Sequence, residues 1–130
     1  DFSLSRGLGD VYKRQMDEHV SREIVYETTA TAPPEELHRF FLACREDGFQ
    51  PARRRLRELL DRFGLAGTDL VNQLHRGLGD VPFLTEGQKL SVTQTMAEAD
   101  FRMVEGGGEA LQLDAMTARL CTLLSPEMKS

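Results

Sequence analysis

The stretch Asp100–Leu120, DFRMVEGGGEALQLDAMTARL, decides the fold. Apolar residues recur at helical spacing on both sides of the three glycines Gly106–Gly108, and consecutive glycines end a helix. We therefore predict two helices around a glycine break, over 85–105 and 109–124. A glutamate flanks the glycines on each side and no Gly-Lys-Ser/Thr follows, so this run does not predict a phosphate-binding loop.

Three segments upstream carry the same helical pattern, over 34–46, 51–63 and 68–77. No segment alternates like a strand flanked by hairpin turns. Five amphipathic helices with short connections predict an all-α five-helix bundle. The side chains expected to face its core are Leu37, Phe40, Phe41 and Cys44; Leu56, Leu59, Leu60 and Phe63; Leu70, Val71, Leu74 and Leu78; Leu90, Ala97, Phe101 and Val104; and Leu113, Met116, Leu120, Cys121 and Leu124.

Local signals mark where these helices begin and end. Thr85 with Gln88 three residues later predicts a capping box, and Thr68 or Asp69 is expected to cap the helix over 68–77. Gly64 predicts a helix stop. If the expected core faces are right, Leu60→Ala or Phe101→Ala would each cost roughly 2–5 kcal/mol.

The two ends of the chain are expected to lie outside the bundle. Residues 1–15 resemble one reading frame of a translated sequencing adapter, and we exclude them from fold reasoning as an expected artefact. Residues 16–32 read as a linker with a short extended piece at 24–26. The helical domain is expected over 33–124, followed by a tail at 125–130.

Composition limits the function. Without residues 1–15 the chain holds 13 basic and 19 acidic residues, and this net formal charge of −6 does not favour nucleic-acid binding by the overall field. No run approaches the ~20 apolar residues of a membrane span, so we expect a cytoplasmic protein without membrane contact. Cys44 and Cys121 lie in apolar helical patterns and are predicted to be buried free thiols.

No residue pattern predicts catalysis or metal binding. The three histidines, His19, His38 and His75, have no second ligand at a metal-binding spacing. Nucleophile–base arrangements and paired carboxylates are also not evident. We therefore expect no catalytic residue, no metal and no cofactor in this chain, and no enzyme activity.

Two charged groups are candidate contact sites. Arg53, Arg54 and Arg57 lie on the polar side of the helix over 51–63, where pairs such as Arg54–Glu58 and Arg57–Asp61 are available. A solvated ion-paired face, a subunit contact and a phosphate contact all remain open for these arginines. Arg102 and Glu105, three residues apart, are expected to pair along the helix over 85–105.

The chain also resembles a known family. From about residue 26 to 124 it is similar to the C-terminal collar domain of replication factor C small subunits, which belong to clamp loaders. Gly107 and Gly108 depart from the family, which usually has Ala-Asn there. The segments that carry the resemblance are Ala97–Gly106 (AEADFRMVEG), Leu111–Ala115 (LQLDA), Arg54–Leu60 (RRLRELL) with Gly64–Gly67 (GLAG), Gln73–Arg76 (QLHR) and Thr29–Glu36 (TATAPPEE).

The resemblance implies an oligomerisation role. In the family, five collars pack into a ring, while AAA+ ATPase domains bind ATP and Mg²⁺ and load the sliding clamp onto primer–template DNA. The chain shows no Walker motif or arginine finger, so the resemblance implies a missing motor, with residues 16–32 as the end of its lid and linker and a nucleoid-associated location. It implies subunit contacts at Arg102, Glu105, Gln112 and Asp114. The alternatives are a free-standing helical nucleic-acid-binding or protein-interaction module, or a related AAA+ assembly.

Overall fold

The computed structural model describes residues 31–126, which form α-helices, one 3-10 turn and no strand. The expectations for residues 1–30 and 127–130 lie outside this range. Within it the five α-helices confirm the all-α bundle, and none of them is long and apolar enough to cross a membrane. The elements are α2 (Pro34–Glu46), α3 (Phe49–Phe63), α4 (Gly67–Gly77), η1 (Leu78–Asp80), α5 (Glu86–Val104) and α6 (Glu109–Leu124).

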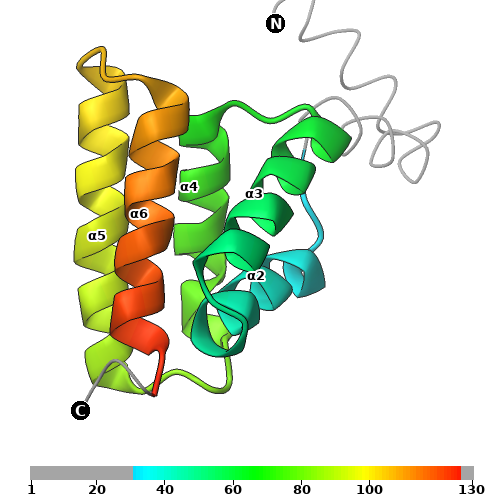
Figure 1. The fold of residues 1–130 in the computed structure, drawn as a ribbon, viewed down its shortest axis with the longest axis vertical. Helices are drawn as coiled ribbons and strands as arrows, with labels where there is room; N and C mark the ends of the chain where they lie inside the picture. Colours follow the sequence, from blue (N-terminus) through cyan, green and yellow to red (C-terminus); the bar gives the residue numbers. More distant parts are fainter. Residues whose placement is uncertain (1–30, 127–130) are drawn as a thin grey trace, which may run out of the picture. The chain divides into compact units, whose positions relative to one another are not determined.

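Helix α6 is the centre of the packing. It contacts α5, α2, α3 and α4, and its longest contact is with α5, to which the glycine turn joins it as an antiparallel hairpin. Helices α3 and α5 pack on opposite sides of α6 (Figure 1). The bundle therefore has two distant flanks, one formed by α5 and the other by α3 with α2.

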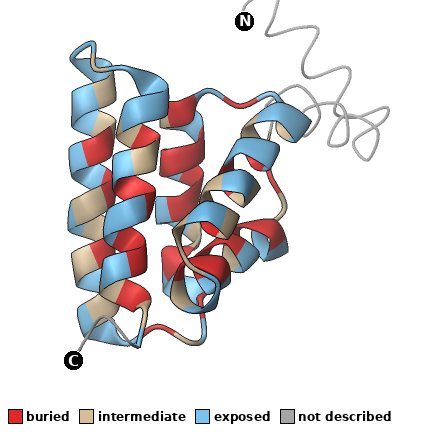
Figure 2. Ribbon diagram, in the orientation of Figure 1, coloured by how far each residue is buried: buried red, intermediate tan, exposed pale blue. Residues whose placement is uncertain are grey.

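The core runs between the helices, along the inner faces coloured red in Figure 2. Burying a large apolar side chain there stabilises the fold by about 1.5–3 kcal/mol. These positions confirm the predicted inner faces of α2, α4 and α6, and Cys44 and Cys121 are buried free thiols as predicted. The largest fully buried side chains are Phe40, Phe41, Leu56, Leu59, Leu70, Leu74, Val81, Val92, Met96, Met116, Leu120 and Leu124.

The predicted capping box of α5 is confirmed. The Gln88 backbone N–H donates to Thr85 Oγ1 at 3.1 Å, and the Thr85 N–H donates to Gln88 Oε1 at 2.9 Å. Gly64 also ends α3 as predicted, in the left-handed conformation with φ 63°. Local sequence therefore fixes both of these helix ends.

The predicted side-chain cap of α4 was wrong. The helix begins at Gly67, and neither Thr68 nor Asp69 caps it. Instead, the Gly67 N–H donates to the carboxylate of Glu109, from the first turn of α6. A side chain distant in sequence thus satisfies one of the free N–H groups at this helix end, and no local pattern could have revealed it.

The predicted inner face of α5 was also wrong. Leu90, Phe101 and Val104 are 66%, 62% and 68% exposed, and Ala97 is exposed as well. The buried residues of α5 are Val92, Met96 and Ala99. Helix α5 is apolar on two faces, and the spacing of the larger side chains pointed to the one that faces outward.

Candidate functional site

The outer stripe of α5, formed by Leu90, Ala97, Phe101 and Val104, exposes apolar side chains to solvent. Intervals of seven, four and three residues place these side chains on one face of a helix with 3.6 residues per turn. That face lies opposite the core-facing Val92, Met96 and Ala99. Exposed apolar side chains that form a continuous patch mark interaction sites.

A further apolar side chain is exposed just after the turn between α5 and α6. Leu111, in the first turns of α6, is 69% exposed. The turn needs glycine, because Gly106 has φ 105° and a Cβ on Gly107 would lie 2.8 Å from the Arg102 carbonyl oxygen. The Gly107 N–H donates to that same oxygen. The glycine run therefore fixes how α5 passes into α6.

A groove of about 470 Å³ runs between α5 and α6 beside the outer stripe. Two of the predicted interface residues, Arg102 and Gln112, line it together. Arg102 Nη2 donates to Glu98 Oε2 at 2.6 Å, one turn earlier, so the expected Arg102–Glu105 pair does not form. The hydrogen bond from Arg102 and its charge hold the pKa of Glu98 below its ordinary value. Glu105 lies exposed at the end of α5.

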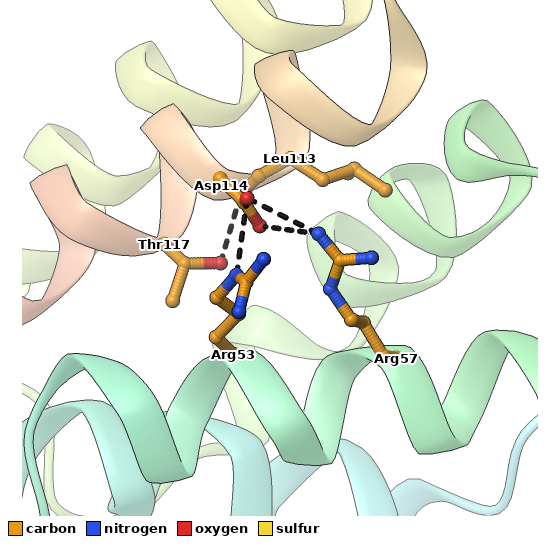
Figure 3. Close-up of polar contacts among 5 residues, drawn as sticks. All are labelled: Arg53, Arg57, Leu113, Asp114 and Thr117. Atoms are coloured by element: carbon orange, nitrogen blue, oxygen red, sulfur yellow. Dashed lines mark hydrogen bonds and ion pairs between the residues drawn. The ribbon is translucent and has the colours of Figure 1, made fainter.

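Asp114, the remaining predicted interface residue, faces α3 instead (Figure 3). Arg53 Nε donates to Asp114 Oδ2 at 3.1 Å, and Arg57 Nη2 donates to Oδ1 at 3.2 Å and Oδ2 at 3.1 Å. The neighbouring Thr117 hydroxyl is fully buried and donates to the Leu113 carbonyl at 2.8 Å. The ion pairs of Arg53 and Arg57 with Asp114, called the clasp below, join α3 to α6 inside the domain. The clasp replaces the expected Arg57–Asp61 pair.

Of the other arginines of α3, two lie near the carboxylate of Glu36 and one is exposed to solvent. Arg55 and Arg62 each approach Glu36 of α2 at 3.9 Å, and Arg39 binds it at 3.2 Å. Arg54 is exposed and, within residues 31–126, forms no ion pair, so the expected Arg54–Glu58 pair is absent there. Glu36 was not among the predicted site residues, although its spacing of three residues from Arg39 was a visible signal.

The thiols lie together in the core. A hydrogen bond with Cys121 and burial raise the pKa of the Cys44 thiol. A buried thiol with a raised pKa is a poor nucleophile. Among the described residues, no group of three or more His, Cys, Asp or Glu side chains is arranged to hold a metal ion.

The fold and this surface define a helical bundle domain with an apolar helix exposed on one flank. The family described as Replication factor C C-terminal domain matches residues 32–119, and the chain belongs to that family.

Three curated relatives, each described as a replication factor C small subunit, illustrate the likeness. The one from Methanosarcina acetivorans is 37% identical over 109 residues, covering 78% of this chain and 32% of its own length. The relative from Archaeoglobus fulgidus is 37% identical over 106 residues, covering 82% and 33%. The relative from Natronomonas pharaonis is 38% identical over 101 residues, covering 78% and 31%. The chain thus spans about a third of the length of these relatives.

Proposed function

We propose that this chain is the collar domain of a clamp-loader small subunit, and that it joins the subunit to its neighbours in a pentameric ring. On this proposal the assembled complex loads a sliding clamp onto primer–template DNA inside the cell, near the nucleoid. ATP and Mg²⁺ would be bound by an ATPase domain outside this chain. On this proposal the chain itself holds neighbouring subunits together and supplies no catalytic group.

The outer stripe of α5 is the observation that carries the proposal. An exposed apolar face on a folded domain is an unfavourable contact with water that a partner surface can remove. The bundle covers Val92, Met96 and Ala99, and nothing in residues 31–126 covers Phe101 or Val104. A neighbouring subunit that covers them would remove this apolar surface from water, which favours association.

Self-association of the full 130-residue chain tests the proposal. Sedimentation velocity from micromolar to near-millimolar concentration should show oligomers for the wild type. The double variant F101S/V104S should remain monomeric with an unchanged helical circular dichroism spectrum. Leu42→Ser, on α2, is the matched control because Leu42 is also apolar and exposed, and it should leave association intact. A wild-type chain that is monomeric throughout would overturn the proposal.

Direct nucleic-acid binding is less well supported. Arg53 and Arg57 share Asp114, so their charges are partly neutralised within the domain. A nucleic-acid module would bind primer–template DNA with an affinity that falls steeply with salt and is lost in the triple Gln variant of Arg53, Arg54 and Arg57. We expect no such salt-dependent binding by this chain in fluorescence anisotropy.

A further inference from the structure

A small pocket with a leucine-lined floor and charged residues at its edge, Glu109 among them, opens between α3 and α6. Its volume is about 160 Å³. Leu60 is only half-buried and Ala110 is exposed, so the pocket reaches the surface. Leu56 and Leu113 form its floor, and Arg57 and Asp114 of the clasp stand at its rim. We call this site the α3–α6 pocket.

Phe101 is the side chain on the outer stripe that best suits such a pocket. It is the largest side chain of the stripe and is 62% exposed. Three carboxylates are near it in sequence: Asp100 is adjacent, and Glu98, which pairs with Arg102, and Glu105 are about one turn away on either side. Aromatic side chains that fill pockets contribute more than other residues to the energy of protein interfaces.

The two features lie at the same end of the domain but on different flanks. Phe101 is in the last turn of α5 and Ala110 is in the first turn of α6, and the glycine turn joins these helix ends. Residues of α3 and α6 line the pocket, and α3 packs on the side of α6 away from α5 (Figure 1). Contact between two different patches is heterologous, and it closes into a ring when one copy is related to the next by rotation without a shift along the axis. Two patches at the same end of the domain can meet under such a rotation.

Charge favours the same pairing. Helix α3 carries five arginines and two carboxylates, whereas Glu86–Glu105 carries four carboxylates with Lys89 and Arg102. Placing α5 on α3 therefore brings opposite charges together, while placing α5 on a second α5 brings like charges together. Like charges across an interface oppose association.

We propose that Phe101 of one copy of this chain inserts into the α3–α6 pocket of the next copy. The inference rests on the proposed collar function, because it names the partner surface that covers the outer stripe. The carboxylates beside Phe101 then face the side of the neighbour's α3 that carries Arg54, which is exposed and forms no ion pair within residues 31–126. Each copy offers one Phe101 and one pocket, so the contact repeats around a ring.

Filling the pocket tests the pairing without touching Phe101. Ala110→Trp places a large side chain at the pocket mouth from an exposed position, and Ala118→Trp makes the same change at an exposed position outside the pocket. In sedimentation equilibrium of the full chain, Ala110→Trp should weaken association at least about tenfold, as expected for loss of a central aromatic contact. Ala118→Trp should leave association unchanged. Equal association of Ala110→Trp and wild type would overturn the pairing.

A photo-crosslinker at position 101 provides a second test. The full chain carrying p-benzoylphenylalanine there is mixed with ¹⁵N-labelled wild type and irradiated, and mass spectrometry identifies adducts between labelled and unlabelled chains. Adducts on residues 56–60 or 110–113 support the pairing. Adducts on α5 would overturn the pairing but leave the assembly function standing. The absence of adducts between chains would overturn both.

Discussion

Both faces of α5 carry apolar side chains, but one face is buried and the other is exposed to solvent. Val92, Met96 and Ala99 are buried against the bundle, while Leu90, Phe101 and Val104 are at least 62% exposed. The outward face carries the larger and more apolar side chains. The inner face stabilises the domain, and the outer face is available to stabilise an assembly.

This contrast separates folding from association on a single helix. Substitutions on the inner face should change the stability of the isolated domain. Substitutions on the outer face should change only what the domain binds. Substitutions in the clasp between α3 and α6, or in the groove between α5 and α6, should have intermediate effects on stability, because the side chains there are partly exposed.

The largest effect is expected inside the core. Met96→Ala removes a side chain that is 2% exposed, so it should lower the free energy of unfolding by about 2–5 kcal/mol through lost burial and a residual cavity. Urea denaturation of dilute, monomeric protein measures this. Leu90→Ala, on the outer stripe of the same helix, is the control and should stay within about 0.5 kcal/mol of wild type. Similar losses for both variants would abolish the distinction between the two faces.

A smaller effect is expected at the clasp between α3 and α6. Asp114→Asn removes the carboxylate that binds Arg53 and Arg57, and because the three side chains are partly exposed the loss should be about 1 kcal/mol. Asp100→Asn makes the same charge change where no ion pair forms within residues 31–126, and should cost less. Chemical denaturation measures the stability loss of each variant at low and at high salt. The difference in loss between Asp114→Asn and Asp100→Asn should be smaller at high salt, because salt screens the ion pairs of Asp114. A difference that does not change with salt would argue against an ionic clasp.

Sequence predicted the positions of the helices well because helical spacing and several helix ends depend on residues that are close in sequence. The Thr85 and Gln88 capping box and the Gly64 stop depend only on neighbouring residues. The errors arose where partners are distant in sequence. Glu109, which caps α4, is 42 residues from Gly67 in sequence. Asp114, which pairs with Arg57 in place of Asp61, is 57 residues from Arg57.

The candidate site was predicted less well than the fold. Arg102 and Gln112 share a groove, but Asp114 faces the opposite flank of α6, so the four predicted interface residues do not form one cluster. Helical periodicity identifies an apolar face without saying what covers it. For Phe101 the covering surface is not the domain's own core, and only the packing of α5 on α6 reveals this.

Phe101→Ser should leave the dilute monomer almost unchanged. The side chain is 62% exposed, and serine and phenylalanine have similar helix propensities, so the free energy of unfolding should change by less than about 0.5 kcal/mol. Chemical denaturation at the lowest measurable protein concentration gives this value. A loss of about 2 kcal/mol or more would place Phe101 in the core, as periodicity alone suggested.

The smallest effect concerns the charge of Glu98 in the groove. Arg102→Gln removes the hydrogen bond and the charge that lower the pKa of Glu98, so this pKa should rise toward its ordinary value in a ¹³C NMR titration. Because the pKa is lowered in the folded state, the pair stabilises the fold above the ordinary carboxyl pKa, and this contribution is lost as pH falls through the pKa of folded Glu98. The stabilities of wild type and variant should therefore converge in acid. Arg119→Gln is the control, since the Arg119 charge is a weaker cause of the same shift. A larger rise for Arg119→Gln than for Arg102→Gln would mean that Glu98 responds to the groove as a whole instead of to its partner one turn away.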